Sequence, residues 1–85
     1  MSQREKLLDD IKNNPKNRDY REIVALFRKY GFIVNESKGG GSHCPVYHPD
    51  FPELVWTLSR KKPMSTFHAK KAVKMVEEVI NNGQE

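Results

Sequence analysis

The chain of 85 residues contains a single cysteine, Cys44, so it can form no internal disulfide. It has no apolar run long enough to cross a membrane, and its first residues are too polar for a secretory signal. These absences predict a cytoplasmic protein. The length predicts one small domain, because a chain of this size is near the lower limit for a domain with its own core.

Metal-ligand spacing is also missing from the sequence. It contains no CxxC or HxxxH-type pattern, and the neighbours His43 and Cys44 would point to opposite faces of a strand. The same alternation argues against Cys44 as a nucleophile, because the thiol turns to the core if His43 faces solvent. We therefore expect neither a metal nor a cofactor, and we expect His48 and His68 to be surface residues.

Acidic residues are absent between Arg60 and Lys74, a stretch that carries six basic ones. The formal net charge of the whole chain is +4, and the excess is concentrated in this second half, before an acidic tail. A basic surface of this kind favours a polyanion as its partner. A solvated lysine face is the alternative that charge alone leaves open.

Three segments have the apolar periodicity of amphipathic helices. The first covers residues 3–13. The second follows Asp19, which is expected to be an N-cap with Glu22 three residues later in a capping box. It ends before Gly31, which suits the left-handed conformation after a helix. The third begins after Ser65 or Thr66 and continues to about residue 81.

Alternating and β-branched stretches predict three strands, at residues 32–35, 42–47 and 54–58. The order α-α-β-β-β-α indicates an α+β domain in which the helices cover one face of a three-stranded antiparallel sheet. Pro45 has no N–H for a ladder, so the second strand is expected to lie at an edge or to bulge there. The expected core contains Leu8, Ile23, Val24, Phe27, Phe32, Val46, Trp56, Val73, Val76 and Ile80.

The stretch from Lys38 to His48 contains the strongest candidate for chemistry. Three consecutive glycines permit positive φ and a close approach to a ligand, and they lead directly to His43 at the start of a strand. A histidine beside such a turn and a lysine could transfer protons near an anion. On residue type alone, an ordinary polar residue at a loop edge is the better explanation.

The order of these features resembles the HicA-type toxins. The resemblance rests on the segment 20–32, then Gly41-Ser42-His43, then a hydrophobic strand and a closing helix with basic residues. It implies a small bacterial or archaeal ribonuclease of a toxin–antitoxin system, with a fold similar to the double-stranded RNA-binding domain. It divides the chain into an N-terminal helical extension at 1–14 and a core at 19–80.

The resemblance also implies that His43 is the catalytic residue of a metal-independent endoribonuclease acting on mRNA. An imidazole can take the proton of a ribose 2′-OH near neutral pH, so that this oxygen attacks the adjacent phosphorus. A HicB-like antitoxin is the implied protein partner. The residues expected to bind RNA are Lys38, Gly41, Ser42, Arg60, Lys61, Lys62, Lys70, Lys71 and Lys74.

Two other functions stay open at this point. The domain could bind RNA without cutting it, with His43 only positioning a phosphate. Alternatively, its main role could be a protein–protein contact through the basic face around His43.

Overall fold

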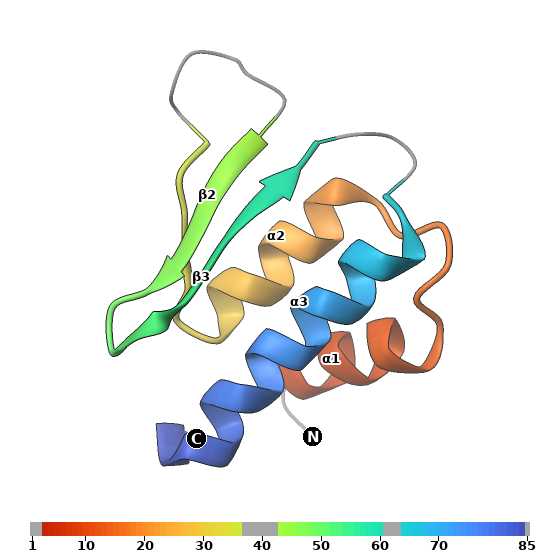
Figure 1. Ribbon diagram of the computed structural model, residues 1–85. Helices are drawn as coiled ribbons and strands as arrows, with labels where there is room; N and C mark the ends of the chain where they lie inside the picture. Colours follow the sequence, from red (N-terminus) through yellow and green to blue (C-terminus); the bar gives the residue numbers. More distant parts are fainter. Residues whose placement is uncertain (1–2, 37–42, 61–63, 85) are drawn as a thin grey trace.

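The computed structural model describes residues 3–36, 43–60 and 64–84, and it is an α+β domain with three helices and a three-stranded antiparallel sheet. Figure 1 shows the helices together on one side of the sheet. The predicted α+β class, with three helices and a three-stranded antiparallel sheet, is confirmed. The elements are α1 (Gln3–Asn13), α2 (Tyr20–Lys29), β1 (Ile33–Val34), β2 (His43–His48), β3 (Phe51–Ser59), α3 (Thr66–Val79) and a π-helical end, Ile80–Gln84.

The residues at the two ends of α2 are those that the sequence predicted, but one predicted contact is missing. Asp19 is the N-cap residue, but its side chain makes no capping hydrogen bond, and Glu22 forms an ion pair with Arg18 at 2.6 Å. The side-chain capping box was therefore a wrong prediction. At the other end, Gly31 has φ +88°, as expected for the residue after the C-cap Tyr30.

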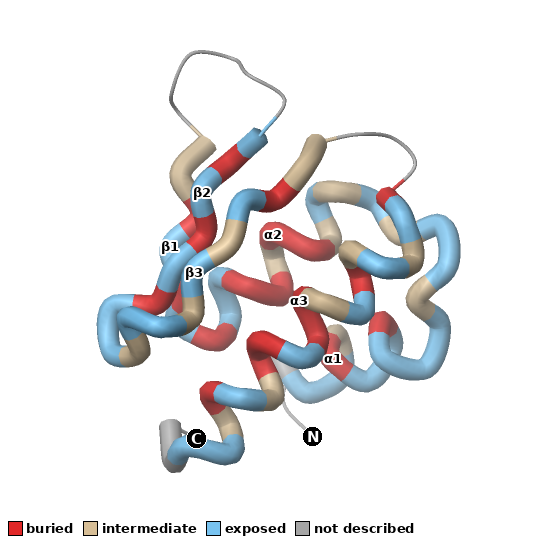
Figure 2. Tube along the Cα trace, viewed as in Figure 1, coloured by how far each residue is buried: buried red, intermediate tan, exposed pale blue. Residues whose placement is uncertain are grey.

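One core joins all three helices to the inner face of the sheet. Figure 2 shows the buried segments of α1, α2 and α3 on the sides that face one another and the strands. α1 contributes Leu8 and Ile11 to this core, and Lys12 at its end pairs with Glu77 of α3 at 2.6 Å. The predicted core residues are buried except Trp56 and Ile80, which are partly buried and pack against the cluster.

The sheet has the order β1-β2-β3, so β2 is its central strand. Pro45 therefore does not lie at an edge, and the irregularity in the ladder falls between Tyr47 and His48 rather than at the proline. The Pro45 carbonyl accepts a hydrogen bond from the Asn35 N–H at 3.0 Å, just beyond the end of β1. In an antiparallel strand the N and C=O of a residue face the same neighbour, so the missing donor faces the end of the shortest strand.

The third strand is longer than expected, because it begins at Phe51 and includes Pro52. Only Pro49 and Asp50 then separate it from β2. No helix in the described ranges has the length and apolar character needed to cross a membrane.

Candidate functional site

His43 is the first described residue after the glycine-rich stretch and the first residue of β2. It is exposed, as are Pro45 and Tyr47, whereas the residues between them point into the core. The prediction that His43 faces outward and Cys44 inward is confirmed. Across the ladder, His43 is paired with Ser59, the last residue of β3.

A cluster of polar side chains lies directly behind His43, and we call it the Arg60 cluster. It is centred on the Cys44 thiol, which is fully buried. Arg60 Nε donates to Cys44 Sγ at 3.0 Å and its Nη2 donates to the Glu36 carbonyl at 2.8 Å. The Tyr20 hydroxyl is 2.9 Å from the same sulfur and donates to Glu36 Oε2 at 2.8 Å. The Arg60 cluster therefore ties α2 to the ends of all three strands.

The charge states within the Arg60 cluster follow from these contacts. Burial raises the pKa of Tyr20, and its hydrogen bonds with Cys44 and Glu36 raise it further. The hydrogen bond to Cys44 likewise raises the pKa of Arg60. The Arg60 guanidinium also lies over the Tyr20 ring, 5.8 Å from its centroid. A fixed cation therefore stands at the end of the sheet that carries His43.

Arg60 was predicted to bind RNA, and its hydrogen bonds to Cys44 and Glu36 join it to its own chain. This geometry suits a residue that fixes the end of β2. Five other predicted RNA-binding residues lie outside the described residues: Lys38, Gly41, Ser42, Lys61 and Lys62.

The remaining candidates, Lys70, Lys71 and Lys74, lie on α3. Lys70 and Lys74 are exposed and Lys71 is partly buried. α3 covers the inner face of the sheet, whereas His43 belongs to the outer face, so these lysines and His43 occupy different layers.

His48 is not the surface residue that was predicted, since only 4% of it is exposed. The alternation of β2 continues to its last residue and turns this imidazole inward. The Asp50 N–H donates to Nδ1 at 3.1 Å, which leaves Nε2 to donate to the Tyr30 carbonyl at 3.2 Å. His48 thus joins the β2–β3 turn to the end of α2, and a Cβ on Gly31 would lie 3.0 Å from its Nε2.

His68 is also less exposed than predicted. Its ring is stacked on Trp56 with a centroid distance of 5.5 Å, and its Nδ1 lies 2.5 Å from Ser65 Oγ. The same hydroxyl accepts from the His68 N–H at 3.1 Å and caps α3. Of the two capping residues that the sequence allowed, Ser65 is the one used.

The outer face of the sheet has an apolar surface beside His43. Ile33, Tyr47 and Val55 are cross-strand neighbours and all are exposed, with Val55 62% accessible. A hollow lined in part by Pro45, Tyr47, Val55 and Thr57 lies on this face. Across the described ranges, no group of three or more histidine, cysteine or acidic side chains is arranged to hold a metal ion.

Comparison of the chain with family models, with curated proteins and with solved structures gave no match. The alternation of β2 and the cap at Ser65 could be predicted from the sequence. The partners of the Cys44 thiol were not, because they come from α2 and the end of β3.

Proposed function

We propose that the chain is a HicA-type endoribonuclease that binds and cleaves mRNA with His43 as its general base. The observation that carries the proposal is the position of His43. It is exposed at the first residue of the central strand, and its neighbour Cys44 is fixed from behind by Tyr20 and Arg60. A general base must be held in place to be effective, and this anchorage supplies the support.

In this proposal the His43 imidazole takes the proton from a ribose 2′-OH. The freed oxygen attacks the adjacent phosphorus, the 5′-oxygen leaves with a proton from solvent or the imidazolium, and a 2′,3′-cyclic phosphate remains. The hollow beside Pro45 and Tyr47 offers an apolar surface for a base that flanks the cleaved bond. Lys70, Lys71 and Lys74 hold backbone phosphates, in keeping with a fold similar to the double-stranded RNA-binding domain.

Such an activity requires control in the cell, so the proposal includes a HicB-like antitoxin as the protein partner. The net charge of +4 and the exposed apolar residues on the outer sheet face suit an acidic protein that covers His43.

The test compares cleavage of an end-labelled single-stranded RNA by the parent, His43→Ala and His43→Gln in the presence of a chelator. One general base contributes ~10²–10⁴-fold in rate, so both variants should lose that much activity while they still bind RNA. Ile33→Ala, an exposed substitution on the same sheet face outside the hollow, is the matched control and should cut normally. A substrate with a single 2′-deoxy nucleotide at the cleavage position should resist cutting.

Equal cleavage by the parent and by His43→Ala would refute the assignment of His43. Tight binding of RNA by the parent without any cleavage would instead favour a non-catalytic RNA-binding module.

A further inference from the structure

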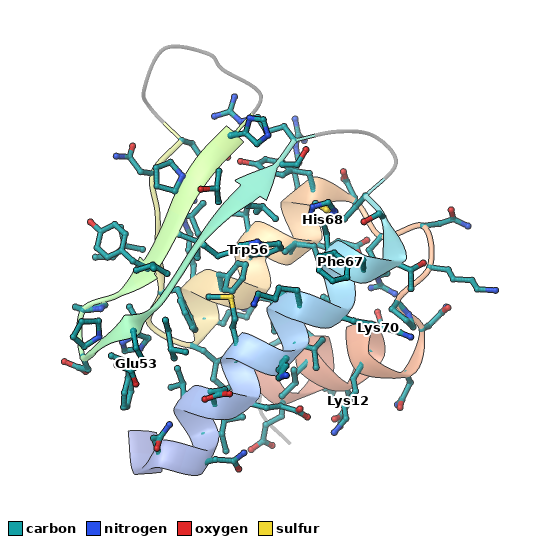
Figure 3. The ribbon with its side chains drawn as sticks, in the orientation of Figure 1. Lys12, Glu53, Trp56, Phe67, His68 and Lys70 are labelled. Atoms are coloured by element: carbon teal, nitrogen blue, oxygen red, sulfur yellow. The ribbon has the colours of Figure 1, made fainter. Side chains whose placement is uncertain are left out.

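Three aromatic rings link β3 to the first turn of α3. The His68 imidazole stacks on the Trp56 indole at 5.5 Å with an interplanar angle of 28°, and Phe67 packs against the same imidazole at 5.7 Å and 75°. Figure 3 shows the three side chains close together at this place. Trp56 and His68 are partly buried, whereas Phe67 is 69% exposed.

Packing does not account for the exposed Phe67 ring. It is the most exposed of the large apolar side chains in the described part of the chain, and the buried face of α3 is formed by other residues. Burial of a phenylalanine ring stabilises a fold, and Phe67 loses most of this stabilisation because 69% of it is exposed. The ring is nevertheless held from behind by His68, which Ser65 fixes in turn.

Basic residues continue the helix face on which Phe67 lies. Lys70, Lys71 and Lys74 follow Phe67 at i+3, i+4 and i+7, which places all four on one stripe of the helix. The acidic residues of α3 come later, at Glu77 and Glu78. The first turns of α3 therefore combine one exposed aromatic ring with three lysines and contain no acidic residue.

We propose that Phe67 is a stacking platform for an unpaired RNA base, with Lys70, Lys71 and Lys74 holding the neighbouring phosphates. Nucleic acid is favoured over an apolar partner, because proteins that bind single strands combine an exposed aromatic ring with basic residues. The basic side chains bind the backbone phosphates, and a base stacks on the ring. The inference rests on the proposed function for its ligand, and it adds a preference for unpaired RNA, because a duplex hides the faces of its bases.

The position of Phe67 suits an RNA strand that also reaches His43. Phe67 is in the first turn of α3, at the end of the molecule shared by the start of β2 and the end of β3 (Figure 1). RNA that runs along α3 toward this end would pass Phe67 after the lysines and would reach His43 by crossing the end of β3.

The experiment measures affinity by fluorescence anisotropy with a labelled 12-nucleotide oligoadenylate and with a 12-base-pair RNA duplex. All proteins carry His43→Ala, so that cleavage does not interfere. Phe67→Ala should weaken binding of the single strand about tenfold to a hundredfold and leave duplex binding unchanged. Phe67→Trp should restore the affinity, and Ile33→Ala, which shortens an exposed apolar residue of β1 outside the hollow, should have no effect.

Charge reversal provides the second arm. Lys70→Glu with Lys74→Glu should weaken both probes and reduce the salt dependence of binding, because phosphate contacts carry no base information. An equal loss of both probes in Phe67→Ala, or no loss of either, would overturn the stacking platform. So would a Phe67→Ala variant that binds RNA normally and fails only to bind a co-expressed protein partner.

This outcome is separable from that of the proposed function. If the parent does not cut RNA but Phe67→Ala selectively loses the single strand, the platform stands and the enzyme proposal fails. If cleavage depends on His43 but Phe67→Ala binds the single strand as the parent does, the reverse holds.

Discussion

The Tyr20 hydroxyl is a direct probe of the Arg60 cluster, because it contacts both Cys44 Sγ, at 2.9 Å, and Glu36 Oε2, at 2.8 Å. Tyr20→Phe removes both hydrogen bonds and little volume. A net hydrogen bond contributes about 0.5–1.5 kcal/mol, and one to a charged group about 1.5–3. Glu36 is 38% exposed, so its bond belongs near the low end. We expect Tyr20→Phe to lower the free energy of unfolding by about 1–2 kcal/mol and the Tm by roughly 5–15 °C.

The effect of Tyr20→Phe should depend on pH in a defined direction. The pKa of Tyr20 in the folded protein is raised above its ordinary value of 10.0, first by burial and then by its hydrogen bonds. The associated stability is fully present below pH 10 and decreases as pH rises further, because the unfolded tyrosine then loses its proton while the folded one keeps it. The contribution falls by up to about 1.4 kcal/mol per pH unit. The phenylalanine variant lacks this dependence, so its stability should approach that of the parent at alkaline pH.

Urea denaturation followed by circular dichroism, repeated from pH 7 to pH 11, measures both effects. Tyr47→Phe is the matched control, since Tyr47 is 40% exposed on the outer sheet face and should change little. A Tyr20→Phe variant within about 0.3 kcal/mol of the parent at pH 7, with the same alkaline slope, would show that the cluster contributes no stability of the expected kind.

Two further substitutions test the turns that fix the helices. Gly31→Ala should lower the free energy of unfolding by about 2 kcal/mol, because φ is +88° and the new Cβ would lie 3.0 Å from His48 Nε2. Measured by chemical denaturation, this loss should be smaller in a His48→Ala background. An equal loss in both backgrounds would rule out the contact. Ser65→Ala should lower the free energy of unfolding by about 1 kcal/mol through loss of the α3 cap, whereas Ser65→Asp should retain the stability of the parent. An alanine variant as stable as the parent would contradict this reasoning.

Local signals were sufficient for much of the fold. Gly31 after α2 and Ser65 before α3 predicted helix ends, because each has a conformation or a hydrogen bond that depends on near neighbours. The outward turn of His43 followed from alternation alone.

Contacts between distant segments were not predictable in the same way. His48 was expected at the surface from the prolines around it, yet it is buried because the end of α2 lies against the β2–β3 turn. Pro45 was expected at an edge or at a bulge because it has no N–H, but strand order does not follow from a single strand's sequence, and β2 is the central strand. Glu22 fits a capping box locally, but its carboxylate pairs with Arg18.

The candidate site likewise has a part that the local sequence predicted and a part that depends on contacts between distant segments. His43 could be selected from the sequence, whereas its support by Tyr20, Glu36 and Arg60 depends on three strand ends meeting α2. Phe67 resembled an ordinary helix residue, because its exposure beside a lysine stripe is apparent only once the buried face of α3 is known.

Pro45 limits how far the first two strands can pair. In the described ranges, the pairing of β1 with β2 ends at Val34 and Val46, and the proline nitrogen that follows has no hydrogen to give. In the described ranges, the backbone of His43 is matched to Ser59 of β3. A proline in mid-sheet thus withholds one hydrogen-bond donor where β1 ends, while its carbonyl still links the two strands through Asn35.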